Sequence, residues 1–273
     1  MSSSLAGKTM IMSGGSRGIG LAIALRAARD GANIAMIAKT AEPHPKLPGT
    51  IHTAAKEIEA AGGNALPIVG DVRDDDTVAA AVERTVEGFG GIDIVVNNAS
   101  AIDTSTSDAL SMKRYDLMQD INCRGTFLLT KTALPHLRRS GNAHVLTLSP
   151  PLNLNPRWAG EHLGYTIAKY GMSLCTLGFA EELAADGIAA NSLWPRTLIE
   201  TAAVSNVLGE RSIDHSRKPA IMADAAHAIL VRDSRACTGN FFIDENVVRE
   251  EGVTDLSVYG GEDLTIDIFL DES

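Results

Sequence analysis

The feature of this sequence that most constrains its fold is a cluster of glycines near the N-terminus. The stretch TMIMSGGSRGIGLAIALRAARDGANIAMIAKT, residues 9–40, places Gly14, Gly15, Gly18 and Gly20 at one bend, between an apolar run and a helix-forming run. Each glycine costs backbone entropy, so four at one bend indicate that the backbone must approach something closely. A glycine-rich bend between a first strand and a first helix is typical of a phosphate-binding turn, because helix N–H groups face the anion there.

Downstream of this glycine bend (residues 14–20), strand-like and helix-like runs alternate. The strand-like runs are residues 9–12, 33–38, 65–69, 92–96, 144–149, 189–194 and 239–243. The helix-like runs are residues 21–30, 53–61, 77–89, 110–137 with an interruption near Asn122, 165–185 and 224–231. This alternation predicts an α/β fold, a Rossmann-like doubly wound sheet of about seven mostly parallel strands with helices on both faces. Without a linker or an internal repeat, we expect a single domain over residues 1–273.

Composition narrows the class of protein further. The formal net charge of −10 argues against nucleic acid or an anionic membrane surface as a partner. No apolar run approaches the roughly 18 residues that a membrane span needs, and the start of the chain lacks a secretory pattern. Cys123, Cys175 and Cys237 lie far apart, which favours reduced thiols and predicts neither disulfides nor a metal site. We therefore expect a cytoplasmic protein.

Further motifs follow the glycine bend in order. They are GDV at 70–72, NNAS at 97–100, Asn122, Ser149, YTIAK at 165–169 and NSLWPRT at 191–197. With the pattern Gly14-x-x-x-Gly18-x-Gly20 ahead of them, the chain resembles the short-chain dehydrogenase/reductase family over nearly its whole length. One YxxxK is a common accident, but the whole series at family spacing is specific. The resemblance implies a nicotinamide nucleotide as cofactor and hydride transfer between an alcohol and a carbonyl compound.

The resemblance also assigns residues to that nucleotide. Asp71 would accept a hydrogen bond from the adenine amino group while Val72 packs against the ring. Residues 98–100 would run beneath the ribose, and residues after 194 would contact the carboxamide, with Arg196 where the family usually has glycine. The full set predicted to bind the cofactor is Gly14, Ser16, Arg17, Gly18, Ile19, Gly20, Lys39, Asp71, Val72, Asn98, Ala99, Ser100, Tyr165, Lys169, Pro195, Thr197 and Ile199.

The end of the second strand bears on which nucleotide binds. NAD-selective proteins usually carry a carboxylate there, whereas this chain has Ala38 followed by Lys39. Lys39 and Arg17 could both pair with a 2′-phosphate, and we therefore predict a preference for NADP(H) over NAD(H). His44 or Lys46, on a proline-interrupted loop, could close over the same phosphate.

Tyr165 and Lys169 carry the predicted chemistry. They are four residues apart on a predicted helix, so their side chains leave the same face. A nearby ammonium would lower the pKa of the phenol, which would let Tyr165 act as general acid and base. The resemblance implies that Lys169 also holds the nicotinamide ribose. It further implies that the backbone carbonyl of Asn122 binds a water of a proton relay, the alternative being a simple helix kink.

Ser149 is an irregular member of the predicted site. Most of the family ends the fifth strand with two serines, the second of which polarises the carbonyl, and here Pro150 takes that second place. Three interpretations are open. Ser149 swings inward on a loop that is longer than usual, Asn153 or Asn155 replaces it, or no side chain polarises the carbonyl and the enzyme is weak or acts differently.

Two more stretches complete the sequence reading. Leu152, Leu154 and Trp158 predict an apolar substrate mouth, and we expect His162 beside them to have no role. From residue 244 onward there are ten acidic residues and one basic residue. We expect this acidic extension, about residues 246–273, to be a solvated face with a strand or an irregular flap.

These observations predict an NADP(H)-preferring oxidoreductase that interconverts a hydrophobic alcohol and its ketone or aldehyde. One alternative is an enoyl or dienoyl thioester reductase on the same scaffold, for which the serine is dispensable. Another is a nucleotide-binding interaction protein with little turnover. The apolar faces of the helices at 110–137 and 165–185 predict a homodimer or homotetramer.

Overall fold

A single parallel sheet organises the computed structural model, which describes residues 4–43, 49–202, 204–205 and 209–271. Its seven strands lie in the order β3-β2-β1-β4-β5-β6-β7, and all neighbouring pairs are parallel. The strand order changes direction between β1 and β4, which is the switch point of a doubly wound sheet. The predicted fold class is confirmed.

The strands are β1 (Thr9–Ser13), β2 (Asn33–Ala38), β3 (Asn64–Val69), β4 (Ile94–Asn97), β5 (Ala143–Thr147), β6 (Ile188–Trp194) and β7 (Phe241–Ile243). The helices are α1 (Gly18–Ala28), α2 (Ile51–Ala60), α3 (Asp75–Phe89), α4 (Met112–Met118), α5 (Gly125–Leu137), α6 (Pro156–Glu161), α7 (Leu163–Glu182), α9 (Ala220–Leu230) and α10 (Asp244–Glu250). A π-helical turn, η1 (Gln119–Arg124), joins α4 to α5, and η2 (Glu210–Ile213) and η3 (Leu256–Tyr259) are 3-10 turns. All seven predicted strands are present, whereas the helices α6 and α10 were not predicted.

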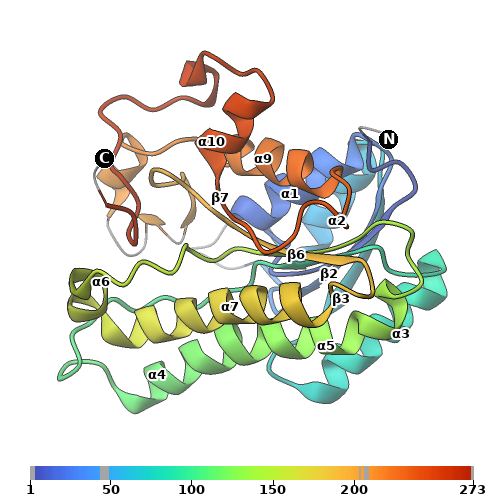
Figure 1. Ribbon diagram of the computed structural model, residues 1–273, viewed down its shortest axis with the longest axis horizontal. Helices are drawn as coiled ribbons and strands as arrows, with labels where there is room; N and C mark the ends of the chain where they lie inside the picture. The colour runs from blue at the N-terminus through green and yellow to red at the C-terminus, as the bar shows by residue number, and fades with distance from the viewer. Residues whose placement is uncertain (1–3, 44–48, 203, 206–208, 272–273) are drawn as a thin grey trace.

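Helices cover both faces of the sheet (Figure 1). α1, α2 and α9 pack on one face, and α3, α5 and α7 pack on the other. Because side chains alternate along a strand, Met10 and Met12 of β1 enter the first core and Ile11 enters the second. Both cores are almost entirely aliphatic. In each of them, the helices turn their apolar faces towards the sheet.

Aromatic side chains gather instead in a third cluster, beyond the carboxyl ends of the strands. It contains both tryptophans, Trp158 and Trp194, together with Tyr165 and Phe269. The fully buried ring of Phe269 lies 5.3–6.2 Å, between ring centroids, from the rings of five aromatic or imidazole side chains. Its φ of 73° is a left-handed conformation that bulky residues rarely adopt. Packing therefore holds the chain here in a strained conformation.

The end of the acidic extension contributes to this cluster through Phe269. We call residues 264–271 the C-terminal segment. The N–H of Leu198 donates to the carbonyl of Thr265 at 2.9 Å, and the N–H of Asp267 donates to the carbonyl of Arg196 at 3.0 Å. The expectation of a solvated acidic face is wrong for this segment, because its apolar residues pack over the carboxyl ends of the strands. The extension also begins with the helix α10 rather than with a strand.

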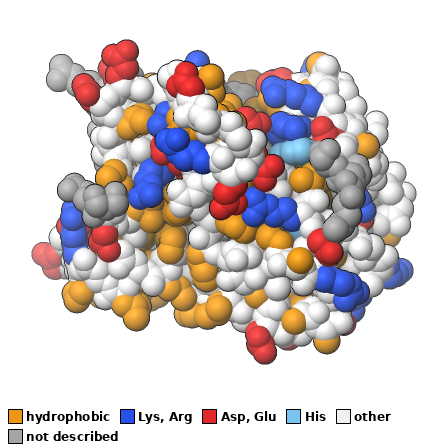
Figure 2. Space-filling view, turned by 45° about the horizontal axis from the view of Figure 1, so that its top comes forward, with side chains coloured by type: hydrophobic (Ala, Val, Ile, Leu, Met, Phe, Trp, Pro, Cys, Tyr) orange, Lys and Arg blue, Asp and Glu red, His pale blue; other side chains and the backbone are white. Residues whose placement is uncertain are grey.

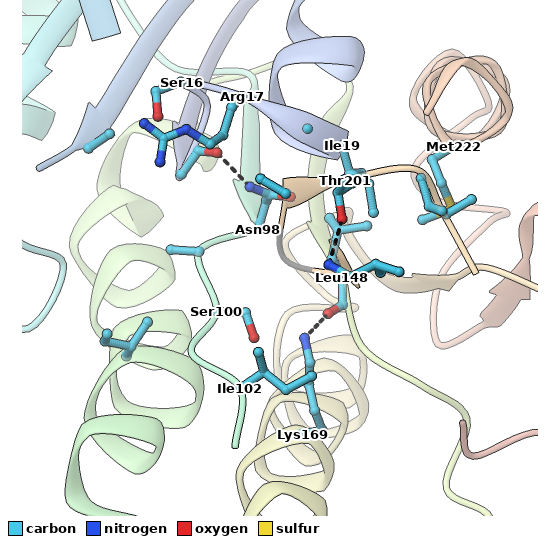
Figure 3. A pocket seen from close by; sticks show the side chains of 18 of the residues that line it. Ser16, Arg17, Ile19, Asn98, Ser100, Ile102, Leu148, Lys169, Thr201 and Met222 are labelled. Atoms are coloured by element: carbon cyan, nitrogen blue, oxygen red, sulfur yellow. Dashed lines mark hydrogen bonds between the residues drawn. The ribbon is translucent and has the colours of Figure 1, made fainter. Parts of the chain in front are cut away.

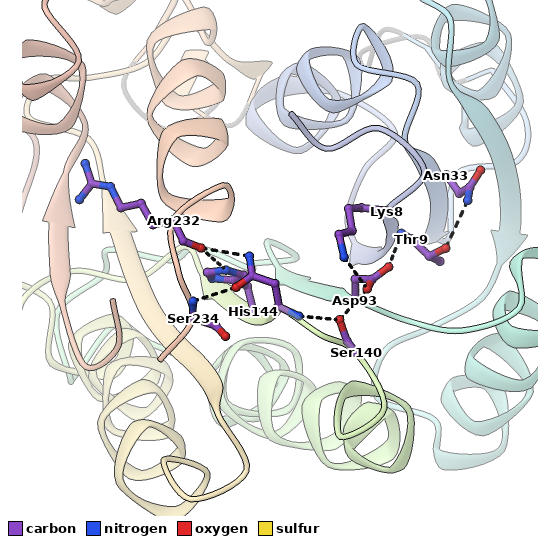
Figure 4. Close-up of polar contacts among 9 residues, drawn as sticks. Lys8, Thr9, Asn33, Asp93, Ser140, His144, Arg232 and Ser234 are labelled. Atoms are coloured by element: carbon purple, nitrogen blue, oxygen red, sulfur yellow. Dashed lines mark hydrogen bonds and ion pairs between the residues drawn. The ribbon is translucent and has the colours of Figure 1, made fainter. Parts of the chain in front are cut away.

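A polar network ties together the amino ends of the strands (Figure 4). Asp93, just before β4, pairs with Lys8 at 3.2 Å and accepts from the N–H of Thr9 at 2.9 Å. The hydroxyl of Ser140 donates to the same carboxylate. Asn142 extends the network to the loop after α9, where it donates to a backbone carbonyl and accepts from a backbone N–H. Partly buried polar groups at this edge thus bond to one another and to the backbone.

The surface carries charges of both signs (Figure 2). Lys and Arg side chains are interspersed with Asp and Glu on the visible face, while hydrophobic side chains gather towards its lower edge. Several large apolar side chains of α5 and α7 are exposed, namely Phe127, Ile167, Leu174 and Leu177. Within the described part of the chain, no helix combines the length and apolarity that a membrane span requires.

Candidate active site

A cavity of about 520 Å³ lies at the carboxyl ends of the strands, beside the switch point between β1 and β4. Doubly wound sheets bind their ligands at this place. The predicted site residues that line it are Gly14, Ser16, Arg17, Gly18, Ile19, Lys39, Asp71, Val72, Asn98, Ala99, Ser100, Tyr165, Lys169, Pro195 and Ile199. The structure therefore brings the two ends of the predicted site, the glycine bend and the pair on α7, into one cavity. Gly20, Asn122, Ser149 and Thr197 lie outside this lining.

The glycine bend is packed tightly against the end of β4. A Cβ on Gly20 would lie 2.5 Å from the side-chain nitrogen of Asn98, and one on Gly14 would lie 2.9 Å from the same atom. That amide donates to the carbonyl of Gly14 at 2.8 Å (Figure 3). Gly18, the first residue of α1, has a φ of +56°. Contacts within the protein therefore require these glycines, and the resulting bend sets the first turn of α1 against the cavity.

Charged side chains meet where the cavity passes the ends of β2 and β3. The ammonium of Lys39 lies 3.5 Å from the carboxylate of Asp71, and Arg73 binds that carboxylate with its closest contact at 2.7 Å. Hydrogen bonds from Arg73 hold the pKa of Asp71 at about 2, so this carboxylate is ionised at neutral pH. Arg17, at the bend, donates to the carbonyl of Gly49 at 3.1 Å.

Arg73 was missed by the sequence analysis, although its place two residues after Asp71 was a usable signal. A base at that spacing in a tight turn can bind the carboxylate, as this arginine does. The predicted closure of His44 or Lys46 over the cofactor lies outside the described residues.

Tyr165 and Lys169 lie one turn apart on α7 and both line the cavity. The ammonium of Lys169 donates to the carbonyl of Leu148 at 2.8 Å (Figure 3) and lies 5.0 Å from the centre of the Trp194 ring. Burial lowers the pKa of Lys169 to about 7. This lysine is therefore close to losing its charge in the structure described here.

The environment of Tyr165 differs from the one predicted. Burial raises the pKa of its phenol far above the usual value, the carboxyl of Asp267 raises it further, and hydrogen bonding with Ser100 opposes the rise. The predicted lowering by Lys169 is wrong for this structure, because the cost of burying the phenolate dominates. Tyr165 thus keeps its proton in this structure.

Asn122 occupies the predicted interruption of the long helix, which is the π-helical turn η1. Its buried side chain accepts from the N–H of Ala101 at 2.7 Å and donates to the carbonyl of the same residue at 3.0 Å. Such turns are frequent at functional sites. Here the two hydrogen bonds position the loop that carries Ser100. The role of the Asn122 carbonyl in a water relay stays a prediction.

Ser149 does not face the cavity. Its buried hydroxyl lies 2.8 Å from the hydroxyl of Ser192 on β6, which in turn donates to Thr176 at 2.9 Å. The predicted substitutes Asn153 and Asn155 donate instead to the carboxylate of Asp271 in the C-terminal segment. The long loop after Ser149 contains α6 and does not turn this serine inward. The inward position of Ser149 is therefore a prediction that the structure corrects.

The stretch after β6 supports the C-terminal segment. The N–H of Arg196 donates to the carboxylate of Asp244 at 2.8 Å, and Thr197 pairs with Ile266. Arg196 is absent from the non-glycine residues of positive φ in the described chain, so glycine is not required there. Pro195 and Ile199 line the cavity, whereas Thr197 is not among its lining residues.

The apolar lining of the cavity comes from other residues than those predicted. Leu154 is 85% exposed, and Trp158 packs against Phe269 and donates to Asp271. His162 belongs to the same aromatic cluster. The apolar side chains that do line the cavity include Ile102, Ile121, Leu148, Trp194, Leu198, Met222 and Ile268. They come from many elements, so no local run of sequence could have indicated them.

Asp267 is the charged cavity residue that the sequence analysis missed. It lines the cavity together with Tyr165 and Lys169. Burial raises its pKa to about 7, and the neighbouring Asp244 adds to the rise while Lys169 opposes it. The available signal was an acid between apolar residues, in TIDIFL at 265–270, within a run that is otherwise polar.

Known proteins agree with this geometry. The family model described as short chain dehydrogenase matches residues 8–211. Hydroxysteroid dehydrogenase-like protein 2 of Xenopus laevis is 59% identical over 98% of this chain, and the human protein of that name is 54% identical. This chain spans about 65% of the length of these curated relatives. These matches confirm the resemblance expected from the motifs.

Two solved structures are similar over almost all of the chain. A dehydrogenase from Xanthomonas campestris has a TM-score of 0.96 and 54% identity, covering 98% of this chain and 100% of its own. A short-chain dehydrogenase from Mycobacterium thermoresistibile has a TM-score of 0.93 and 58% identity, covering 98% and 96%.

Proposed function

This chain belongs to the short-chain dehydrogenase/reductase family, and from that premise we propose that it is an NADP(H)-preferring oxidoreductase that interconverts a hydrophobic alcohol and its ketone or aldehyde. The observation that carries the proposal is the cavity itself, which joins the glycine bend to Tyr165 and Lys169. A dinucleotide needs a phosphate cradle and a reaction centre within one continuous space.

The residues along the cavity fit such a nucleotide. The first turn of α1 offers backbone N–H groups and a positive dipole end to the diphosphate. The ionised carboxylate of Asp71 is an acceptor for the adenine amino group, and Val72 and Ile121 offer apolar contacts to the ring. When bound, the nicotinamide nucleotide supplies or accepts the hydride.

The residues of α7 then handle the proton. Tyr165, whose phenol is kept neutral by burial, donates its proton to the carbonyl oxygen during reduction and takes it back during oxidation. Lys169 is placed to hold ribose hydroxyls with the ammonium that now donates to Leu148. The apolar lining excludes water, which strengthens the hydrogen bonds made to the substrate oxygen.

Three basic residues near the carboxylate of Asp71 support the preference for NADP(H). Arg17 and Lys39 line the cavity, and Arg73 adjoins it through Asp71. At the end of β2, Ala38 stands where NAD-selective proteins carry a carboxylate. A 2′-phosphate would meet net positive charge here, and a guanidinium can bind two of its oxygens at once.

The remaining expectations are part of the same proposal. The exposed apolar side chains of α5 and α7, such as Phe127 and Leu174, suit a homodimer or homotetramer. The three cysteines are free, which suits a reducing cytoplasm. The contacts between the C-terminal segment and residues 196–198 suit a single domain over residues 1–273.

The position of Ser149 favours a second candidate, an enoyl or dienoyl thioester reductase. Its hydroxyl pairs with Ser192 and is not available to a substrate carbonyl in the cavity. Reduction of a conjugated carbon–carbon double bond on this scaffold does not need that serine.

A substrate panel tests the proposal. We would incubate the protein with NADPH or NADP⁺ and follow the absorbance of the reduced nucleotide. The panel contains hydrophobic ketones and aldehydes, their alcohols, hydroxysteroids because the curated relatives carry that word in their name, and enoyl thioesters. Turnover of carbonyls and alcohols supports the primary proposal, turnover of thioesters alone favours the second candidate, and nucleotide binding without any turnover favours an interaction protein.

A further inference from the structure

We propose that Asp267 is a catalytic residue, which donates a hydrogen bond from its carboxyl group to the oxygen of the substrate carbonyl. The inference rests on the proposed oxidoreductase function and names the group that takes the role usually given to a serine in this family. It assigns a function to an acidic segment that looks like a solvated tail in the sequence.

Three other donors near the reaction centre are engaged elsewhere. Ser149 bonds to Ser192, and the proline that follows it has no donor. The ammonium of Lys169 donates to the carbonyl of Leu148. The hydroxyl of Ser100 interacts with the phenol of Tyr165. Asp267 lines the same cavity and belongs to the C-terminal segment.

The segment that carries Asp267 is held on both sides of this residue. Before it, Ile266 pairs with Thr197, and the N–H of Asp267 itself donates to the carbonyl of Arg196. After it, the indole of Trp194 donates to the carbonyl of Ile268 at 3.1 Å, and Phe269 is buried among aromatic rings. A donor fixed in advance stabilises developing charge without a reorganisation cost at the moment of reaction.

The charge state of Asp267 follows from its neighbours. Lys169 and Tyr165 face it from α7, Asp244 faces it from α10, and Trp194 hydrogen-bonds to it from β6. Arg217 acts one step further away, because it lies near Asp244. Burial dominates, and the pKa of Asp267 rises to about 7, so a large fraction carries a proton in neutral solution. A neutral carboxyl group in an apolar site can donate to an oxyanion.

The reaction balances with this donor in place. During reduction the carbonyl carbon accepts a hydride from the reduced nicotinamide nucleotide, and the carbonyl oxygen accepts the proton of Tyr165. Asp267 keeps its own proton throughout. The ionised carboxylate has no proton to donate, so reduction should slow as the pH rises through the pKa of Asp267.

Four variants, namely Asp267→Ala, Asp267→Asn, Asp263→Asn and Ser100→Ala, test the proposal with 9,10-phenanthrenequinone as the carbonyl probe and NADPH as reductant. Asp267→Ala removes the donor and should lower kcat/KM about 10²–10³-fold. Asp267→Asn keeps a donor that cannot ionise, so it should retain most activity and lose the part of the alkaline fall between about pH 6 and about pH 8 that Asp267 causes. The part caused by Lys169, whose pKa is also about 7, should remain in this variant. Asp263→Asn is the matched control, an acid of the same extension at a left-handed position that asparagine accepts. It should behave like the wild type.

A second readout needs neither substrate nor nucleotide. Infrared difference spectra between acidic and alkaline buffer should contain the C=O band of a protonated carboxyl group that titrates near neutrality. Asp244 is a second buried carboxyl whose pKa is raised to about 7, so it contributes to the same band. The whole band should persist in Asp263→Asn, whereas Asp267→Asn should lose the Asp267 component and keep that of Asp244. An unchanged band in Asp267→Asn would overturn the assignment of the proton.

The outcomes separate the two proposals. If the wild type reduces the quinone and both Asp267→Ala and Asp267→Asn match its rate and pH profile, the role of Asp267 is overturned and the proposed function stands. If Ser100→Ala alone removes the activity, Ser100 is the donor and Asp267 is not. If the wild type binds NADPH but reduces neither this quinone nor any carbonyl of the panel, the proposed function fails and the role of Asp267 fails with it. Should Asp267→Ala not fold, the pH profile of Asp267→Asn decides.

Discussion

At the amino ends of the strands, Asp93 bonds to an ammonium, a hydroxyl and a backbone N–H, and Asn142 bonds to the next loop. At the carboxyl ends of the same sheet, Tyr165, Lys169 and Asp267 line an open cavity, and burial displaces the pKa of each. Both edges carry ionisable side chains that bond to other groups of the protein. They differ in whether those side chains line a cavity that a ligand can enter.

This difference separates a structural polar cluster from a functional one. A displaced pKa does not by itself identify a functional residue. Burial also lowers the pKa of His144 to about 4, and this residue lies at the amino ends of the strands, which we call the amino edge. The ring of His144 bonds to the carbonyl of Arg232 and does not line the cavity. A displaced pKa in a residue that also lines the cavity indicates a ligand-binding or catalytic role. At the amino ends, the groups that bond to Asp93 and Asn142 stabilise the fold.

The largest expected effect is a loss of turnover, caused by a change at the carboxyl ends of the strands. Tyr165→Phe removes the proton donor and should lower kcat about 10²–10⁴-fold, while the dissociation constant of NADPH changes little. Steady-state assays and nucleotide titration measure the two quantities separately. Tyr170→Phe is the matched control, since Tyr170 packs on the same Phe269 ring without lining the cavity. Full turnover by Tyr165→Phe would contradict the role of Tyr165 as proton donor.

The second largest effect is a loss of stability, caused by a change at the amino ends of the strands. Asp93→Ala leaves the donors of Lys8, Thr9 and Ser140 without their acceptor, and should lower the free energy of unfolding by about 1.5–3 kcal/mol. Urea denaturation measures this change. Asp75→Ala, which removes an exposed ion pair with Arg124, should cost less than about 1 kcal/mol. If Asp93→Ala weakens nucleotide binding at unchanged stability, the contrast between the edges is wrong.

A smaller effect concerns the choice of nucleotide. Lys39→Asp reverses a charge beside Asp71 and should raise the ratio of the NADPH to the NADH dissociation constant about tenfold or more. Lys56→Asp, on the exposed face of α2, should leave the ratio unchanged and serves as the control. Equal weakening for both nucleotides in Lys39→Asp would contradict the NADP(H) preference.

The smallest effect is expected at Ser149. Because its hydroxyl bonds to Ser192 outside the cavity lining, Ser149→Ala should change kcat/KM by less than about threefold and cost roughly 1 kcal/mol of stability. Thermal unfolding and steady-state kinetics measure both. A loss of about 100-fold in kcat/KM would show that Ser149 turns towards the substrate after all.

The fold could be predicted from sequence because its signals are local. The alternation of apolar runs and helices gives the sheet, and the glycine bend and the Tyr165–Lys169 spacing lie within short windows. The interruption at Asn122 is local too, and it is the turn η1. These signals also sufficed for most of the residues between residue 14 and residue 100 that line the cavity. Ile37, Ala38, Thr40 and Gly70 line it as well and were not among the predicted site residues.

The rest depends on contacts between distant residues. The direction of the Ser149 hydroxyl is set by Ser192 and Thr176, which are 43 and 27 residues away in the sequence. Asp267 reaches the cavity because Phe269 docks in a cluster that includes Trp158 and Trp194. The pKa of Tyr165 depends on burial by that cluster, which its neighbour on the helix does not reveal. Charge counting placed the acidic extension in solvent because it ignored the apolar residues between the acids.

The most direct test of the account is a titration of the wild-type protein with NADPH and with NADH, followed by tryptophan fluorescence. Trp194 lines the cavity and Trp158 lies in the neighbouring cluster, so a bound nicotinamide nucleotide should change their emission. We expect saturable quenching by both nucleotides, with NADPH binding more tightly. No saturable change with either nucleotide, confirmed by equilibrium dialysis, would contradict the claim that this cavity is a dinucleotide site.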